Sequence, residues 1–344
     1  MSAPAAPSRV LVIQLRRLGD VLLTSSLLDD LRAAFPSAQL DFLVGAAAAP
    51  VLDHHPLIHE RIIYDRDRTI GMWRNIRSRH YDWIVDVQSS PRTAQLVRLS
   101  GARVRVGWRV DGWGWVYTHR LTRKRAPEWV VRERERLLEL VGVPPLTALP
   151  RLTLTESERR AGQDEARALG LATSPYVGLL LSAGEPSRAW RVDGFAELAD
   201  RLNADGVVPL IFLGTDDQER AAQFRKKTST GVFTPEALPL RRFLGLLAGC
   251  RAFVSGDTGP AHMATALGVP RVTLYGPSPP ATWNPGLPTT PPVFAPNVPC
   301  LGCCLNVCPI GHDCMRDLSA ERVHAAVRTL LVLNGGLPAR AAAR

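Results

Sequence analysis

The chain has 344 residues, 46% of them hydrophobic, and its 42 Lys and Arg against 32 Asp and Glu give a formal net charge of +10. This length favours two domains, and no apolar run reaches the ~18 residues of a membrane span. The basic excess favours anionic partners, but no basic block with interleaved aromatic residues indicates nucleic-acid binding, so a membrane surface or glycolipid is favoured instead. Residues 1–9 lack the layout of a secretory signal, and we expect a cytoplasmic protein that could contact the membrane peripherally.

The first predicted unit is a strand, a loop, a helix and a second strand. Residues 9–15 form a β-branched run typical of a strand buried in a parallel sheet, residues 21–35 repeat apolar side chains at helical spacing, and residues 39–44 form the next strand. Asp20 lies in the loop at the carboxyl end of the first strand, where ligands gather in open α/β sheets. Asp20 is therefore either part of a ligand site or the N-cap of the following helix.

The alternation continues more loosely, with strands at 61–64, 82–87 and 103–107 and helices at 72–79 and 92–99. Between Trp108 and Trp129 the pattern dissolves into a segment rich in tryptophan and basic residues. Aromatic rings bury apolar faces and arginine pairs with phosphate. The segment is therefore either an acceptor-facing surface or a packed loop with a solvated basic edge.

Three prolines between residues 142 and 150 indicate a domain boundary. We assign a first domain to residues 1–145, a second to residues 151–318, and a last helix to residues 319–334, which could pack back on the first domain. The second domain repeats the order of strand, loop and helix, with strands at 176–181, 207–213 and 252–255. This alternation implies parallel sheets with right-handed crossovers.

The stretch 252–276 is a strand, a tight turn, a helix and a second strand. Helix N-termini present free backbone N–H groups to anions, and Gly256 lets the backbone come close to a ligand. Asp257 and Thr258 can cap or hydrogen-bond, and Pro260 suits the first helical turn. A phosphate fits this turn, although a well-capped connection between two strands would have the same sequence pattern.

The other loops of the second domain add groups that a nucleoside diphosphate requires. Ser182 and Arg188 lie on the loop after the strand 176–181, and acidic residues follow the strand 207–213. Hydroxyls, a cation and a carboxylate suit phosphate oxygens, their charge and the ribose diol. None of these loops is a GxGxxG or a P-loop, so neither dinucleotide binding nor P-loop chemistry is indicated.

Four stretches together resemble one known family: VLVIQLRRLGDVLLTSSLLDDLRAAFP, DWIVDVQSSPRTAQLVRLSGARVRVG, the RAW of loop 182–191, and SGDTGPAHMATALGVPRVTLYGPSPPATWNPG. They are similar to glycosyltransferase family 9, the ADP-heptose:lipopolysaccharide heptosyltransferases and their relatives, over roughly residues 9–333. The resemblance implies a GT-B fold, an α/β architecture of two Rossmann-like domains with parallel sheets facing across a cleft. It also implies acceptor binding by the first domain, nucleotide-sugar binding by the second, and an inverting transfer that requires no metal or other cofactor.

The resemblance also assigns residues to catalysis and to donor binding. Asp20 matches the proposed catalytic base in L-G-D-V, which would take the proton of the acceptor hydroxyl. Arg188 stands where the family usually has Lys and, as a fixed cation, would neutralise the leaving diphosphate. Arg191 replaces a common Pro, a second departure in this loop. The motif that holds the pyrophosphate is matched by Asp257, Thr258, Gly259, Pro260 and His262.

The remaining assignments are looser. Ser182 is expected on the nucleotide-sugar, and the acid that binds the ribose is expected at Asp217 or Glu219. Acceptor contacts are assigned to Arg16, Arg17 and Gln88.

Five of the six cysteines lie between residues 300 and 314. The spacing of Cys300, Cys303, Cys308 and Cys314 could surround a tetrahedral zinc, whereas it does not match a ferredoxin cluster. Permanent disulfides are disfavoured in a cytoplasmic protein. We interpret this loop as a structural staple, with or without zinc, and not as a source of a catalytic thiolate.

The function expected from these observations is inverting transfer of a sugar, heptose from ADP-heptose, to a lipopolysaccharide core or another glycolipid or oligosaccharide. One alternative is a nucleotide-sugar 2-epimerase of the same two-domain architecture, which needs no acceptor. Another is a metal or iron–sulfur protein built on the cysteines.

Overall fold

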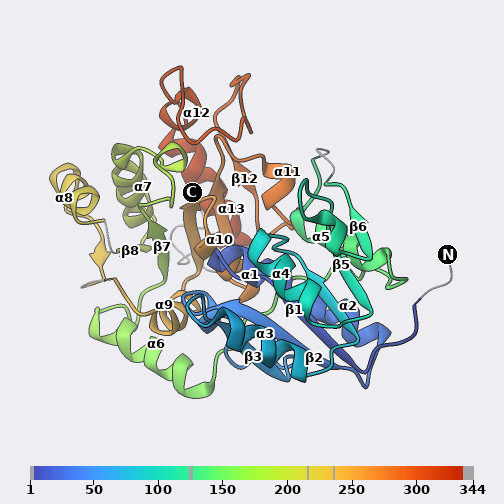
Figure 1. Cartoon of the computed structure of the whole chain (residues 1–344). Coiled ribbons are helices and arrows are strands. Elements are labelled where there is room, and N and C mark those ends of the chain that lie inside the picture. The colour runs from blue at the N-terminus through green and yellow to red at the C-terminus, as the bar shows by residue number, and fades with distance from the viewer. Residues whose placement is uncertain (1–3, 124–126, 215–216, 235–236, 336–344) are drawn as a thin grey trace. The chain divides into compact units, whose positions relative to one another are not determined.

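The computed structural model of the chain describes residues 4–123, 127–214, 217–234 and 237–335. It divides into two compact units, Met1–Thr153 and Leu154–Arg344, each built round one parallel sheet (Figure 1). The division lies just beyond the proline-rich segment 142–150.

The sheet of the first unit has the strand order β3-β2-β1-β4-β5-β6. Its strands are β1 (Arg9–Ile13), β2 (Gln39–Gly45), β3 (Glu60–Tyr64), β4 (Trp83–Asp86), β5 (Val104–Trp108) and β6 (His119–Leu121). Its helices are α1 (Leu18–Ser25), α2 (Leu27–Ala34), α3 (Thr69–Ser78), α4 (Pro91–Leu99) and α5 (Val130–Glu139), with the short 3-10 turns η1 (Ala49–Leu52) and η2 (Gly114–Val116).

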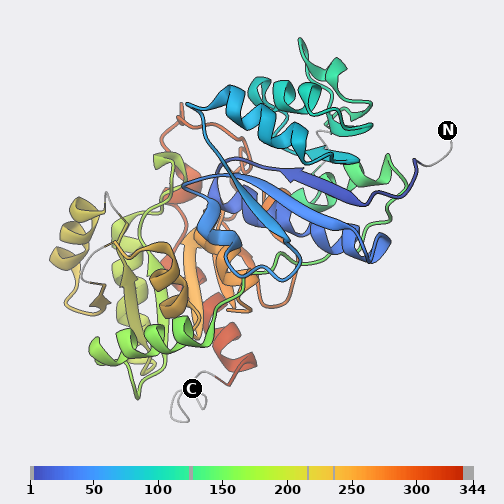
Figure 2. The same ribbon diagram turned by 60° about the horizontal axis from the view of Figure 1, so that its bottom comes forward.

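Both faces of this sheet are covered by helices. Figure 2 shows α3 and α4 on one face and α1 and α2 on the other. The central strand β1 is therefore apolar on both sides, and residues 10–13 are fully buried. The side chains of Met72 and Ile76 on α3 and of Leu96 and Val97 on α4 belong to the core on their face.

The sheet of the second unit has the order β12-β11-β10-β7-β8-β9. Its strands are β7 (Tyr176–Leu180), β8 (Val208–Phe212), β9 (Val232–Phe233), β10 (Ala252–Gly256), β11 (Arg271–Leu274) and β12 (Pro292–Val293). Its helices are α6 (Glu156–Ala168), α7 (Val192–Ala204), α8 (Gln218–Lys227), α9 (Leu240–Leu247), α10 (Gly259–Ala266), α11 (Pro280–Trp283), α12 (Asp313–Arg316) and α13 (Ala320–Leu333), with the turn η3 (Pro186–Arg188).

Helices α6 and α9 cross at very short range. A Cβ on Gly162 of α6 would lie 2.2 Å from the backbone of Gly245 on α9, so only glycine permits this approach. Beside the crossing, Glu158 accepts from Nε and Nη2 of Arg241, both at 2.7 Å. The same carboxylate accepts from the Thr155 amide in a capping box, and together these contacts join the start of α6 to α9.

Helix α13 packs against α7 and against β10 and β11 of the second unit. Val323, Val327 and Leu330 of this helix belong to the core of that unit. A contact of the final helix with the first unit, which the sequence suggested, stays a prediction.

Two details of the chain differ from the sequence-based prediction. The helix predicted at 21–35 begins earlier, at Leu18, and is divided at Ser26, whose backbone stays in the helical region. The irregular segment 108–129 contains the strand β6, and residues 124–126 of this segment lie outside the described residues. The tryptophans of this segment differ from one another in burial, since Trp108 is fully buried and Trp115 is 64% exposed.

Both sheets have the same topology. In each, the first strand of the unit lies beside the fourth, so β1 neighbours β4 and β7 neighbours β10. The chain leaves these neighbouring strands toward opposite sides, which makes the crevice at their carboxyl ends the ordinary ligand position of a doubly wound sheet. None of the described helices is long and apolar enough to cross a membrane.

Candidate functional site

Asp20 lies in the first turn of α1, directly after β1. Helix α1 begins at Leu18, and its N-cap is Arg17, so the alternative that Asp20 caps the helix is wrong. Arg17 has a positive φ of 58°, which is uncommon for a residue other than glycine. This turn directs Asp20 to a partner on another helix.

That partner is Arg134 of α5. Nη2 of Arg134 lies 2.5 Å from Oδ1 of Asp20, and Nη1 donates to the Asp20 carbonyl and to Oγ1 of Thr24 at 2.8 and 2.9 Å. The Arg134 side chain is 7% exposed and that of Asp20 is 23% exposed. Burial lowers the pKa of Arg134 below its usual value, and Asp20 acts in the opposite direction. Asp20 is thus held through one oxygen by a buried cation.

A cavity of about 660 Å³ opens at the carboxyl end of the first sheet. It is lined by residues that follow four strands: Leu15, Arg16, Gly45, Tyr64, Arg66, Gln88, Ser90, Pro91 and Arg92. Oε1 of Gln88 accepts from Nε2 of Gln14 and from the Leu15 amide, at 3.0 and 3.2 Å. This fixes the side chain and leaves its amide nitrogen available to donate.

Arg16 and Gln88, both predicted as acceptor contacts, therefore line one cavity, whereas the exposed Arg17 is not among its lining residues. Sequence reasoning missed Arg66 and Arg92, which also line it. A second cavity of about 360 Å³ shares Tyr64, Arg66 and Arg92 with the first. Their positions in the sequence could have indicated them, because each arginine follows a strand of the sheet within a few residues.

The loop after β4 is held rigidly at the cavity wall. Ser89 adopts a positive φ of 45°, and its amide donates to the fully buried Asp86 at 2.8 Å. Tyr117 donates to the other oxygen of Asp86 at 2.8 Å, and Trp113 donates to the Ser89 carbonyl. Burial raises the pKa of Asp86 to about 6. Through these hydrogen bonds, the aromatic segment 108–123 holds the loop in place.

In the second unit, the loop after β10 leads straight into α10. Asp257 is 5% exposed, Thr258 is the N-cap of α10, and Pro260 lies in its first turn. A Cβ on Gly256 would lie 2.8 Å from the carbonyl oxygen of Arg188, so the loop 182–191 packs directly on this glycine. Gly259 is the first helical residue, and α10 has no acidic residue in its first turn.

The structure brings the predicted cation to the predicted anion-binding turn. Nη1 of Arg188 lies 3.7 Å from Oδ2 of Asp257, and Nε2 of His262 lies 3.8 Å from Oδ1 of the same carboxylate. His262 is 5% exposed and lies 6.0 Å, between ring centroids, from Trp283. Asp257 thus sits between two groups that can carry positive charge.

Two hydroxyls near this turn are buried without a hydrogen-bond partner among the described residues. Thr258 caps α10 by position, but its Oγ1 makes no capping bond, and Oγ of Ser187 in the loop 182–191 is likewise unpaired. Buried hydroxyls are normally hydrogen-bonded. Unpaired hydroxyls at a helix N-terminus are the groups that an incoming phosphate would satisfy.

The residues predicted for the nucleoside lie in different surroundings. Asp217 is 3% exposed, and its Oδ2 accepts from the Gly214 amide at 2.7 Å, so it closes its own turn. Ser182 lies on the same side, with its Oγ 3.6 Å from a Cβ position on Gly214. Glu219 is exposed on α8, where it accepts from Gln223. The assignment of the ribose acid stays a prediction, and the exposed Glu219 is the freer carboxylate.

The cysteine-rich segment is folded but does not gather its sulfurs tightly. The Cys303 amide donates to the Cys300 carbonyl in a turn, and the His312 amide donates to Sγ of Cys308. Burial raises the pKa of Cys314, and the thiols of Cys300, Cys303 and Cys308 act in the same direction. All six cysteines are free. No three described cysteines have sulfurs within 4.8 Å of one another. The described thiols therefore do not form the compact site that their spacing in the sequence suggested.

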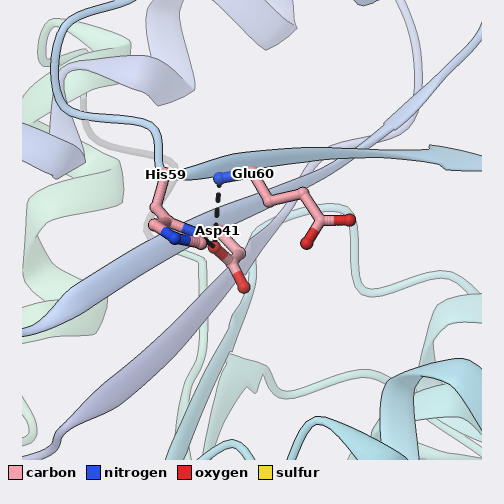
Figure 3. Close-up of side chains that lie close together, drawn as sticks. All are labelled: Asp41, His59 and Glu60. Carbon is pink, nitrogen blue, oxygen red and sulfur yellow. Dashed lines mark hydrogen bonds and ion pairs between the residues drawn. The ribbon is translucent and has the colours of Figure 1, made fainter.

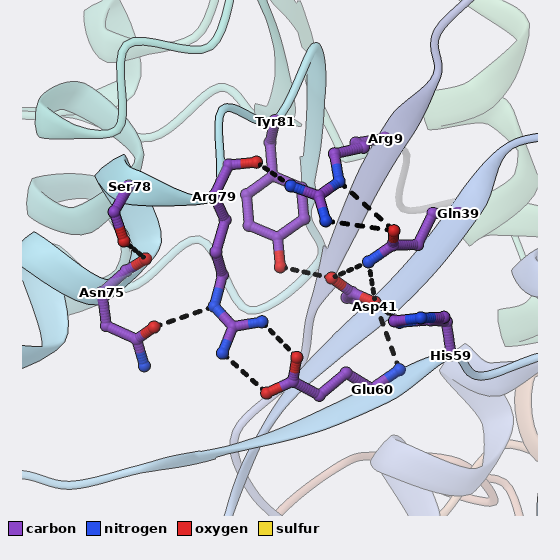
Figure 4. Close-up of polar contacts among 9 residues, drawn as sticks. All are labelled: Arg9, Gln39, Asp41, His59, Glu60, Asn75, Ser78, Arg79 and Tyr81. Carbon is purple, nitrogen blue, oxygen red and sulfur yellow. Dashed lines mark hydrogen bonds and ion pairs between the residues drawn. The ribbon is translucent and has the colours of Figure 1, made fainter.

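Within the described part of the chain, only Asp41, His59 and Glu60 come that close together (Figure 3). They lie near the amino ends of β2 and β3, away from the carboxyl ends. Tyr81 and the Glu60 amide donate to Asp41, and Arg79 pairs with the Glu60 carboxylate (Figure 4). These protein groups already occupy the carboxylates, so we interpret the group as a structural network.

Comparison with known proteins agrees with this geometry. The sequence profile described as glycosyltransferase family 9 (heptosyltransferase) matches residues 70–311. Lipopolysaccharide heptosyltransferase 1 of Pseudomonas aeruginosa is 30% identical over 295 residues, covering 81% of this chain and 80% of the relative. A family 9 glycosyltransferase structure from Veillonella parvula superposes with a TM-score of 0.84 at 22% identity, covering 96% of this chain and 99% of the other.

A structure of Escherichia coli ADP-heptose lipopolysaccharide heptosyltransferase II gives a TM-score of 0.78 at 22% identity, over 95% of this chain and 99% of the other. The fold is thus GT-B. A UDP-N-acetylglucosamine 2-epimerase structure from Listeria monocytogenes is more distant, with a TM-score of 0.51 at 12% identity. An iron-containing heptosyltransferase gives 0.58 at 16% identity.

Proposed function

Because the chain belongs to glycosyltransferase family 9, the heptosyltransferases, we propose that it transfers heptose from ADP-heptose to a lipopolysaccharide-core acceptor with inversion at the anomeric carbon. It is a glycosyltransferase. The residue roles rest on two places, which we call the switch points: the carboxyl ends of β1 and β4 in the first unit, and those of β7 and β10 in the second. One holds a carboxylate on a buried arginine, and the other holds the hydroxyl of Thr258, unpaired among the described residues, at the N-terminus of α10.

The proposed chemistry on the acceptor side depends on Asp20. The acceptor hydroxyl oxygen attacks the anomeric carbon from the face opposite the nucleotide, a new C–O bond forms, and the bond to the phosphate oxygen breaks. Asp20 accepts the hydroxyl proton. Arg134 holds Oδ1, and no described residue donates to Oδ2, so we assign the proton to Oδ2.

On the donor side, the departing diphosphate gains negative charge as the bond breaks. The amides that begin α10, the hydroxyl of Thr258 and the guanidinium of Arg188 are proposed to stabilise that charge. Asp257 is proposed to orient Arg188 and His262 and not to touch the phosphates, because two negative groups would repel each other.

The acceptor is proposed to occupy the 660 Å³ cavity of the first unit. Arg16, Arg66 and Arg92 line it with no described carboxylate in its wall, which suits an acceptor that carries carboxylate or phosphate groups. Gln88 offers a fixed amide for a sugar hydroxyl. We include peripheral contact with the cytoplasmic membrane face in the proposal, because a glycolipid acceptor lies there.

A structural zinc at the cysteine-rich segment is a separate proposal. Four thiols in the sequence have the chemistry for zinc, but their present spacing does not fit a bound ion, and we route no step through one. Elemental analysis of the purified protein would find one zinc per chain if the proposal holds. Zinc and iron below a tenth of an equivalent would remove both the zinc proposal and the iron–sulfur alternative.

The transfer itself is tested with purified protein, ADP-heptose and deacylated lipopolysaccharide cores of increasing length, with product detected by mass spectrometry. The proposal predicts addition of one heptose, and prior incubation with ADP should raise the unfolding temperature, because a ligand of the native state stabilises it. Turnover of a UDP-sugar without acceptor would instead support the epimerase. Absence of transfer to any core would refute the proposed function.

A further inference from the structure

The exposed sides of α3 and α4 form one continuous face on the first unit, which Figure 1 shows with the two helices side by side. We call this face the α3–α4 surface. It consists of Ile70, Trp73 and Arg74 on α3, of Arg92, Arg98 and Leu99 on α4, and of the loop residues Arg66 and Arg68. The buried sides of the same helices belong to the core, so the surface is the unpartnered half of an otherwise packed layer.

The surface presents large apolar side chains to solvent. Ile70 is 66% exposed and Leu99 is 44% exposed. Trp73 connects the two helices, because its Nε1 donates to the Leu99 carbonyl at 2.9 Å. Ile70, Trp73 and Arg74 lie three or four residues apart, so they share one side of α3. Both helices thus contribute to one exposed apolar strip.

The apolar strip is surrounded by positive charge. Five arginines on the surface form no ion pair with any described residue: Arg66, Arg68, Arg74, Arg92 and Arg98. Helices α3 and α4 contain no acidic residue. In the loop before α3, Asp65 and the exposed Asp67 alternate with Arg66 and Arg68, so the arginines still outnumber the acids on this surface. A solvated surface without a partner would ordinarily mix charges of both signs.

The surface also borders the proposed acceptor cavity. Arg66 and Arg92 line both cavities of the first unit, and Trp73 and Leu99 line the smaller one. A glycolipid whose sugar enters the larger cavity would therefore leave the enzyme past this surface. Its lipid part must remain in the bilayer.

From these observations we infer that the α3–α4 surface docks on an anionic lipid bilayer. The guanidinium groups of this surface that lie outside the cavity walls would lie among anionic headgroups, while Ile70 and Leu99 would insert at the boundary with the acyl chains. Exposed aliphatic side chains among unpaired arginines suit a membrane interface better than the acidic and polar surface of a protein partner. The inference rests on the proposed glycolipid acceptor and names the surface that would bring the enzyme to it.

Binding is tested by sedimentation of the full chain with vesicles of phosphatidylcholine alone and with 30% phosphatidylglycerol. The double variant Arg74→Gln/Arg98→Gln removes two charges outside the cavity walls. At about five-fold per arginine, it should weaken binding to the anionic vesicles roughly 25-fold. Ile70→Ser should weaken it roughly five-fold. Val307→Ser, which changes an 82% exposed side chain of the other unit, is the matched control and should bind as wild type does.

Equal binding to both vesicle types, absence of binding by the wild type, or the same loss in Val307→Ser would overturn the inference. Capture of an acidic protein by a chain that ignores vesicles would reassign the surface to a protein partner. All four altered positions are exposed, so unchanged unfolding temperatures are expected and should be verified.

An activity comparison separates this inference from the proposed function. With a deacylated, water-soluble acceptor, the surface variants should transfer heptose at the wild-type rate. With the same acceptor carried by a lipid in anionic vesicles, their rate should fall in proportion to the lost binding. If the wild type transfers to neither acceptor, the proposed function fails whatever the vesicles show. If the variants lose both activities equally, the docking role fails and the function stands.

Discussion

Replacement of Asp20 by alanine should damage the fold as well as the chemistry, because it leaves a buried cation without its counter-charge. The Arg134 side chain is 7% exposed, and Asp20 is the carboxylate with which it pairs. Breaking a buried ion pair from one side costs about 3–5 kcal/mol. Hydrogen bonds from Arg134 to the Asp20 carbonyl and to Thr24 persist, and Asp20 is partly solvated, so we expect the lower end, about 3 kcal/mol.

The assay is thermal unfolding together with heptose transfer. For a unit of this size, about 3 kcal/mol lowers the unfolding temperature by roughly 6–12 °C. Asp20→Asn keeps an acceptor for Arg134 and should lose about half as much. The double variant Asp20→Ala/Arg134→Met removes both charges and retains a side chain of similar length, so it should recover most of the lost stability. Transfer should fall by a factor of about 10²–10⁴ in all three variants if Asp20 is the base.

The double variant separates the two roles of the carboxylate. If it unfolds like the wild type and still transfers no heptose, the lost activity cannot be attributed to unfolding. If it is stable and active, Asp20 is a structural partner of Arg134 and the proposed base is wrong. An Asp20→Ala protein as stable as the wild type would refute the energetic reasoning about the buried pair.

Three further outcomes are expected. Glu158→Gln should cost about 3 kcal/mol at pH 7, because hydrogen bonds from Arg241 lower the pKa of Glu158 to about 2 from 4.5. Because the pKa is lower in the folded state, ionised Glu158 stabilises the fold fully above pH 4.5, and this contribution is lost as the pH falls toward 2. Urea unfolding at pH 3 should therefore show roughly half of the pH 7 difference in stability between wild type and variant. Gly256→Ala should weaken ADP binding at least ten-fold in calorimetry, because its Cβ meets the Arg188 carbonyl at 2.8 Å; unchanged affinity would contradict that role for the loop. Arg92→Gln should raise the KM for acceptor about ten-fold with little change in kcat, and a KM effect on ADP-heptose instead would move Arg92 out of the acceptor cavity.

Sequence reasoning found the site elements that are local in the chain. A β-branched run followed by glycine, a capping residue and a helical proline specifies a strand, turn and helix without information from elsewhere. That is why the turn 255–262 and the position of Asp20 after β1 could be located in advance. The contact of Arg188 with Asp257 was not predicted, but it has a simple cause, because the neighbouring parallel strands β7 and β10 bring their carboxyl-end loops together.

The contacts that could not be predicted are those made by helices. Arg134 lies 114 positions after Asp20, in a helix whose interleaved glutamates and arginines read as a solvated face. Only the packing of α5 on α1 brings it under the carboxylate. Arg66, in the loop after β3, and Arg92, in the first turn of α4, likewise line one cavity, and no spacing rule in the sequence relates them.

The two units share one topology, and in each unit a helix follows each of the two neighbouring central strands: α1 and α4 in the first unit, α7 and α10 in the second. The charge in the first turn of these helices bears on which of them can bind a phosphate. In the first unit, α1 carries Asp20 in that turn, so a negative charge already occupies the place where a helix N-terminus attracts phosphate. In the second unit, α10 carries no acid there and presents the unpaired hydroxyl of Thr258. A diphosphate would be repelled from the first position and attracted to the second. The same contrast exists within each unit, because α7 carries Asp193 in its first turn and α4 carries no acid there. The proposed division therefore takes the base from the helix after the first strand of one unit and the diphosphate site from the helix after the fourth strand of the other.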